Sequence, residues 1–278
     1  MVILNRKLGQ SAFHIVFFPL VVIWSYPFLW MISSAFKSQK EMLLGGASLI
    51  PESFTIANLE RAWIKAKFAA YFFNSVVVTC SVVLVILIVS ATAGYALARG
   101  SMPGKKWIVA GLVATMFLPK GVTILPVFEL IQGLGLNNSY AAIILAEAGP
   151  ANIVAILLFM GYFSNIPAEL EESAVMDGAK FLTVFSKIML PLTKPIIGTV
   201  AIFNFIGSWN AFLVPLVFTL SKPKLRTLGV GMYSFFGENS VDWAGFAAGA
   251  LISVMPTVIV FLFFQKYFIE GLAGAVKG

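Results

Sequence analysis

The chain has 278 residues, of which 59% are hydrophobic and 11% are charged, and its mean hydropathy is +0.93. Because a soluble domain carries about a quarter charged residues, this composition excludes a soluble protein and predicts an integral membrane protein. The formal net charge of +7 would suggest a nucleic-acid partner in a soluble protein. In a membrane protein, basic residues flank the spans and meet anionic head groups, so we expect membrane lipid and no nucleic acid as a partner.

The first predicted element is a membrane span over residues 12–34. It lies in an uncharged run over residues 8–36, which is too long for the apolar core of a cleaved signal peptide, so we expect a retained span. Pro19 and Pro27 are compatible with a span, because neighbouring helices can satisfy the carbonyls that prolines leave unbonded. A polar loop over residues 35–70 follows.

The second and third spans are predicted over residues 72–98 and 107–130, joined by a short basic turn over residues 99–106. Each is longer than the roughly 20 apolar residues that cross a bilayer. The third span is the least regular, because it contains Pro119 and Pro126. We expect a hinge or a broken end there.

The fourth span is predicted over residues 141–163 and carries two polar residues, Glu147 and Asn152. No half of the chain repeats the other, so residues 1–278 are expected to form a single membrane domain. The remaining predicted elements are a polar insert and two further spans, over residues 165–194, 195–220 and 243–265.

Six spans place both termini and the insert on the same side of the membrane. Lysine and arginine are slightly more numerous on that side than on the other. The positive-inside rule therefore favours cytoplasmic termini and a cytoplasmic insert.

The insert has the pattern of two short helices joined by a glycine turn. Pro167 suits a first helical turn, and Gly178 can adopt the left-handed conformation that ends a helix. A second helix, starting near Ala179, has apolar residues spaced i, i+3, i+4 and i+7. The insert is either the docking site of a soluble protein or an ordinary loop with an interfacial amphipathic helix. The apolar residues are Phe181, Val184, Phe185 and Ile188.

The insert contains the pattern Glu172-Ser-Ala, three residues, Gly178, nine residues, Ile-x-Leu-Pro. This pattern resembles the EAA loop of ABC-importer permeases and has every spacing of that motif. One departure is Ser173, where the family usually has alanine. Serine is small, so a packed helix surface should tolerate it.

The resemblance extends over nearly the whole chain and is strongest to the carbohydrate branch, in particular to the second permease of maltose-type sugar importers. One departure is Met160–Phe163, where relatives often have an arginine before the glycine. The segments that carry the resemblance are Ser34–Lys37, Asn74-Ser75, Gly135–Tyr140, Trp209-Asn210 and Gly271–Gly278.

This resemblance implies an all-α protein with six transmembrane helices, the ABC type I importer permease fold, in the inner membrane of a bacterium. It also implies three partners: a second permease subunit, an ABC ATPase dimer that binds ATP and magnesium, and an extracytoplasmic solute-binding protein that delivers the sugar. This chain itself would bind no cofactor.

The same resemblance implies that the insert couples to the ATPase. Glu172 would meet a basic residue of the ATPase, Ala174 would permit close packing, and Gly178 would allow the turn. The other coupling candidates are Glu171, Ser173, Asp177, Leu190 and Pro191.

The chain is not expected to be an enzyme. Gly104-Lys105 superficially suggests a P-loop, but Arg99 stands where its first glycine should be, and Lys106 stands where serine or threonine is needed. No catalytic constellation occurs elsewhere. His14 is more typical of a packed histidine than of a metal ligand, so no metal site is expected.

Polar residues inside the spans are the candidates for the substrate pathway, because polar groups are costly in a membrane. For the asparagines, interhelical hydrogen bonds are the alternative role. Gly245 and Gly249 form a small-xxx-small pattern, which predicts close helix packing. The pathway candidates are Glu147, Asn152, Asn204, Ser208, Trp209 and Asn210.

The function expected from the sequence is that of a permease subunit of an ATP-driven sugar or oligosaccharide importer. One alternative keeps the importer but changes the cargo to a non-sugar solute, such as a phosphorylated polyol, an amino acid or a peptide. Another is an ion-coupled secondary transporter, for which Glu147 is the best ion-coupling candidate.

Overall fold

The computed structural model describes residues 2–237 and 240–276, with side chains at residues 15, 17–119, 121–149, 153–237 and 240–266. The described chain is built of helices, and its β-structure is a single isolated bridge between Phe236 and Val241. The predicted all-α fold is therefore confirmed. The chain divides into two compact units: unit 1 comprises Met1–Ala69 and Gly231–Met255, and unit 2 comprises Ala70–Val230 and Pro256–Gly278.

Unit 1 contains the first long helix, the polar loop and the start of the last helix. Arg61 and Asp242 form an ion pair with 2.9 Å between Nε and Oδ2, and Asp242 Oδ1 also accepts a hydrogen bond from the Gly245 amide. Asp242 therefore caps the last helix and ties it to the polar loop. The main helices here are α1 (Val2–Ser34), α2 (Gln39–Leu44), α3 (Ala57–Glu60), η1 (Arg61–Lys65), η4 (Met232–Phe235) and the first part of α14 (Trp243–Val276).

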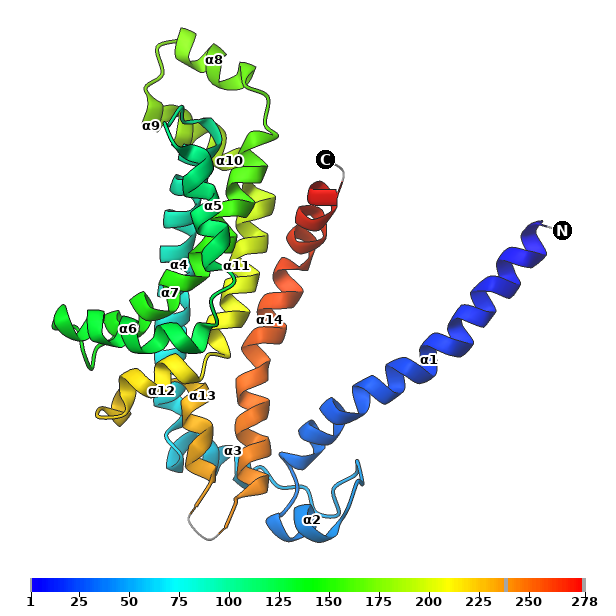
Figure 1. Ribbon diagram of the computed structural model, residues 1–278. Coiled ribbons are helices and arrows are strands. Elements are labelled where there is room, and N and C mark those ends of the chain that lie inside the picture. Colours follow the sequence, from blue (N-terminus) through cyan, green and yellow to red (C-terminus); the bar gives the residue numbers. More distant parts are fainter. Residues whose placement is uncertain (1, 238–239, 277–278) are drawn as a thin grey trace. The chain divides into compact units, whose positions relative to one another are not determined.

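Unit 2 contains most of the other helices, with α8 at one end and α12 toward the other (Figure 1). Its core lies where α4 meets α7 and α11, around residues such as Val82, Phe159 and Val200. The helices are α4 (Phe68–Arg99), α5 (Lys105–Thr115), α6 (Lys120–Gly133), α7 (Tyr140–Ser164), α8 (Glu169–Met176), α9 (Phe181–Thr183), η2 (Val184–Met189), α10 (Leu190–Leu192), α11 (Lys194–Trp209), α12 (Leu213–Thr219), η3 (Pro223–Leu225) and α13 (Leu228–Gly231).

Among the described residues, three single helices are long and apolar enough to cross a membrane, and bent helix pairs raise that number to as many as five. Six crossings therefore stay a prediction. The two halves of α7 are bent by 55°, and α11 is bent by 75° from the helical segment Phe181–Leu192. The single helices are Phe17–Ser34, Phe68–Arg99 and Trp243–Lys266.

The irregularity expected within residues 107–130 is a break between α5 and α6. α5 ends at Thr115, and Pro119 is the N-cap of α6 in an extended conformation. Proline disfavours helical geometry at the residue before it, so Leu118 cannot continue α5.

The run over residues 195–220, predicted as one span, also consists of two helices. α11 ends at Trp209 and α12 begins at Leu213. Pro215 explains the break, because it has no amide to bond the carbonyl of Ala211 and its ring would clash with that carbonyl in a continuous helix. The run is uniformly uncharged, so its charge pattern does not reveal the break.

Candidate functional site

The insert has the helix–turn–helix form that the sequence predicted. Gly178 has a φ of +81°, and its amide donates to the Val175 carbonyl at 2.9 Å. The Ala179 amide donates to the Ala174 carbonyl, also at 2.9 Å. These two bonds form a Schellman motif. A Cβ at residue 178 would meet nothing within 4 Å, so the turn needs glycine for its backbone conformation and not for space.

The second half of the insert packs against the rest of unit 2 along its apolar stripe. Val184 is buried, and Phe185 and Ile188 are partly buried against the core. Phe181 is the exception in this stripe, because 63% of its surface is exposed. The chain then bends at α10, where Leu190 is partly buried and Pro191 is exposed, and continues into α11.

The coupling candidates on α8 fall into two groups. Glu172, Ser173 and Asp177 are exposed, and the Ser173 hydroxyl donates to the Glu169 carbonyl of its own helix. Ala174 is buried. Glu171 differs from its neighbours, because its carboxylate is paired with Arg99 of α4 at 2.7 Å.

Large apolar side chains are exposed beside these polar residues. Met176 is 87% exposed and Leu182 is 73% exposed, one on each side of the glycine turn. The insert therefore presents apolar side chains next to the exposed carboxylate of Glu172.

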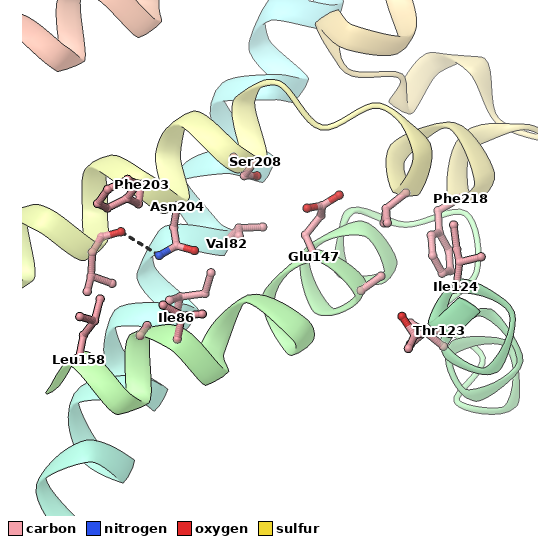
Figure 2. A pocket seen from close by; sticks show the side chains of 17 residues that line it. Val82, Ile86, Thr123, Ile124, Glu147, Leu158, Phe203, Asn204, Ser208 and Phe218 are labelled. Atoms are coloured by element: carbon pink, nitrogen blue, oxygen red, sulfur yellow. Dashed lines mark hydrogen bonds between the residues drawn. The ribbon is translucent and has the colours of Figure 1, made fainter. Parts of the chain in front are cut away.

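A cavity of about 420 Å³ lies in unit 2 between α4, α6, α7, α11 and α12. Figure 2 shows Glu147 on α7 across this space from Asn204 and Ser208 on α11. Asn204 Nδ2 donates to the Val200 carbonyl at 2.8 Å. The rest of the wall is largely apolar, so the few polar groups can orient a solute that has hydroxyl groups.

The structure brings together three of the six predicted pathway residues: Glu147, Asn204 and Ser208. Trp209 is not on the wall, because it is buried with its ring 5.5 Å from that of Phe205 and 5.6 Å from that of Phe72. Asn210 is exposed and donates to the Ile206 carbonyl of its own helix. The side chain of Asn152 lies outside the described residues.

Sequence reasoning missed two parts of this region. Thr123 contributes a hydroxyl to the cavity from α6, and nothing in the local pattern marks it. A second cavity of about 400 Å³ contains Asn137 and Asn138, and Ile124 and Phe218 line both cavities.

Gly245 and Gly249 lie in tight contact within unit 1. A Cβ at residue 245 would lie 2.4 Å from Asp242 Oδ2, and a Cβ at residue 249 would lie 2.7 Å from a ring carbon of Phe235 and 2.9 Å from the Phe68 ring. Both positions therefore require a residue without a side chain.

A family model described as "Binding-protein-dependent transport system inner membrane component" matches residues 56–273. The chain belongs to this family. The resemblance seen in the sequence is thus confirmed, and the family consists of transport permeases that are not themselves catalytic.

Individual members of this family are similar along nearly their full length. The chain is 36% identical to the probable ABC transporter permease protein YurM of Bacillus subtilis, with 98% of this chain and 90% of that protein covered. It is 33% identical to the melibiose/raffinose/stachyose import permease protein MelC of the same organism, with 91% of each chain covered. It is 32% identical to the trehalose/maltose transport system permease protein MalG of Thermococcus litoralis, with 93% of this chain and 94% of that protein covered.

A solved structure has the same fold. It is the crystal structure of a bacterial ABC transporter involved in the import of the acidic polysaccharide alginate. The TM-score is 0.83 at 24% identity, and the match covers 95% of this chain and 98% of the other. The predicted ABC importer permease fold is therefore confirmed.

Proposed function

We propose that this permease imports a sugar or oligosaccharide, driven by ATP hydrolysis on a separate ATPase. The observation that carries the proposal is the exposed insert, in which the carboxylate of Glu172 and the apolar side chains of Met176 and Leu182 are all exposed near the turn at Gly178. A separate protein that docks there would bury the apolar groups and pair the charge. The family supports this assembly, and the relatives named for sugars support the cargo.

The remaining partners follow from the same proposal. A second permease subunit shares the pathway, a solute-binding protein outside the membrane delivers the sugar, and an ATPase dimer binds ATP and magnesium. The chain lies in a bacterial inner membrane, with its termini and insert in the cytoplasm. Glu172, Ser173, Asp177 and Gly178 form the docking face, and the buried Ala174 permits close packing of α8 on the rest of unit 2.

The cavity between α7 and α11 is the proposed part of the sugar pathway in this chain. Glu147, Asn204 and Ser208 offer hydrogen-bonding groups in an otherwise apolar wall, as sugar hydroxyls require. Hydrogen bonding between helices is the competing role for these groups.

The test is uptake by the assembled complex in proteoliposomes that contain ATP. Radiolabelled diacetylchitobiose, raffinose, maltose and trehalose are the probes, chosen from the sugars in the names of similar permeases. Replacing both Glu172 and Gly178 with alanine is expected to abolish ATP-dependent uptake, because the double variant removes the charge and strains the turn. Gly161→Ala, at an exposed helical position with nothing within 4 Å of the added Cβ, is the matched control. Unchanged uptake by the double variant in an intact complex would overturn the proposal.

Two alternative functions have tests of their own. Glu147 is an ion-coupling candidate on the cavity wall, so uptake that follows a proton gradient without ATP would favour a secondary transporter. The other alternative is an importer of a non-sugar solute such as a phosphorylated polyol. One relative, the sulfoquinovosyl glycerol transport system permease protein SmoH of Agrobacterium fabrum, is 30% identical. Radiolabelled glycerol phosphate therefore belongs among the probes.

A further inference from the structure

A polar cluster joins the end of α4 to the first turn of α8. Arg99 Nε lies 2.7 Å from Glu171 Oε1, and the Tyr95 hydroxyl donates to Glu171 Oε2 at 3.1 Å. Arg99 Nη2 also donates to the carbonyl of Ile166, in the segment that leads into α8. Glu171 is thus held through both of its carboxylate oxygens, and Arg99 is held through two of its nitrogens. We name Tyr95, Arg99 and Glu171 the α4–α8 clamp.

The clamp is well shielded from water. The side chains of Arg99 and Glu171 are 19% and 18% exposed, and Tyr95 is 2% exposed. A shielded ion pair is less screened by salt than a surface pair. Removing one partner leaves the other charge partly buried and unmatched.

Aromatic packing fixes the position of Tyr95. Its ring centroid lies 5.2 Å from that of Phe163 on α7, 5.4 Å from that of Phe181 and 5.1 Å from that of Phe185. The last two belong to the second half of the insert. The insert therefore contacts α4 from both sides of the glycine turn, through the clamp and through these rings.

The other end of this connection is the wall of the cavity. α4 runs without a break from Phe68 to Arg99, and Val82 and Ile86 on it line the cavity. Arg99 lies thirteen positions after Ile86, which is about 20 Å along a helix. A continuous helix transmits a displacement over that distance with little bending.

We propose that Tyr95, Arg99 and Glu171 are positioning residues that transmit movement of α8 to α4, and through α4 to the wall of the cavity. This inference rests on the proposed function, because it takes the docked ATPase as the source of the movement. It gives Glu171 a different role from Glu172: Glu172 faces the partner, and Glu171 passes the partner's movement into the membrane helices.

The experiment uses the full complex in nanodiscs, with the partner subunits free of cysteine. Cys80 is the one cysteine of this chain and is exposed on α4, so it carries an environment-sensitive fluorophore. Three quantities are measured: the amount of ATPase that co-purifies, the rate of ATP hydrolysis, and the fluorescence change on adding ATP and vanadate. The variants are Arg99→Gln, Glu171→Gln and the double variant. Glu169→Gln, an exposed carboxylate on the same helix, is the matched control.

We expect both single variants to retain the ATPase and to hydrolyse ATP, while the fluorescence change falls by roughly 2- to 30-fold. The fluorescence change of the double variant should be no smaller than that of either single variant, because the two residues act as one unit. Glu169→Gln should match the wild type in all three measurements. A role confined to stability would lower ATPase recovery and hydrolysis together with the fluorescence change.

A wild-type fluorescence change in Glu171→Gln, or additive losses in the double variant, would overturn the inference while leaving the proposed function intact. Failure of the wild-type complex to retain an ATPase or to respond to ATP would instead overturn the proposed function.

Discussion

At the scale of single residues, Gly178 shapes the insert through its backbone. Its φ of +81° lies in the left-handed region, where a residue with a Cβ costs roughly 1–2 kcal/mol. Gly178→Ala should therefore weaken the Schellman turn and lower the amount of ATPase recovered with the complex. Gly178→Asn should be milder, since asparagine tolerates this conformation. Quantitative co-purification measures the amount of ATPase recovered. Equal amounts from the alanine variant and the wild type would contradict this prediction.

Gly94 is required for a different reason, because there is no room for a side chain at its position. A Cβ on it would lie 2.5 Å from Phe159 Cβ and 2.9 Å from the Met160 amide nitrogen, so α4 and α7 approach closely there. We expect Gly94→Ala to destabilise the protein by about 1–3 kcal/mol, because the added methyl group overpacks this contact. Gly161→Ala on α7 is the control, since its added Cβ meets nothing. Thermal denaturation in detergent measures both; a Gly94→Ala midpoint equal to that of the control would refute the prediction.

The sequence was informative about residues whose role is local and uninformative about residues whose partners are distant. It placed the turn at Gly178, because a left-handed cap depends on one residue and its neighbours. It grouped Glu171 with the residues that couple to the ATPase but did not reveal its ion pair, because Arg99 lies far away along the chain and only the fold brings the two together. Trp209 and Asn210 were assigned to the pathway by position alone, and their side chains pack or bond elsewhere.

At the scale of elements, one buried amide holds three segments of unit 2 together. Asn74 on α4 donates to the carbonyls of Lys224 and Arg226, each at 2.8 Å, and accepts from the Tyr140 hydroxyl at 2.7 Å. The start of α4, the start of α7 and the loop before α13 therefore meet at a single side chain.

Replacing Asn74 with leucine should lower the free energy of unfolding by about 2–4 kcal/mol, because two carbonyls and a hydroxyl lose their partner in a buried site. Thr92→Val is the control, since the Thr92 hydroxyl is exposed and bonds only to carbonyls of its own helix. The measurement is the midpoint of thermal unfolding in detergent. Similar midpoints for the two variants would show that the three segments do not depend on Asn74.

Element boundaries were predicted well where a run of apolar residues ends at charges, as for α4. They were predicted poorly where a helix breaks inside an apolar run. Pro119 was recognised as a cause of irregularity, whereas Pro215 was overlooked, although the same steric reason applies to both. A charge-based definition of spans cannot detect such breaks.

At the scale of the whole molecule, we expect a mild-detergent purification to recover this chain with a second permease and a P-loop ATPase. Mass spectrometry of the co-eluting proteins is the measurement. Recovery of this chain alone, stable and still able to transport after reconstitution, would contradict the proposed assembly. The family could be recognised from motif spacing alone, because the EAA pattern spans only 20 residues from Glu172 to Pro191.

The exposed apolar side chains on the insert have a consequence for how the cell handles a chain made without its partners. Met176 and Leu182 are exposed on the insert, and exposed apolar groups of this kind are interaction or aggregation sites when no partner covers them. Docking of the ATPase would cover both side chains, so the insert would also act as a check on subunit stoichiometry. The chain should then have a shorter half-life in cells that lack the ATPase, and exchanging Met176 and Leu182 for polar residues should lengthen it.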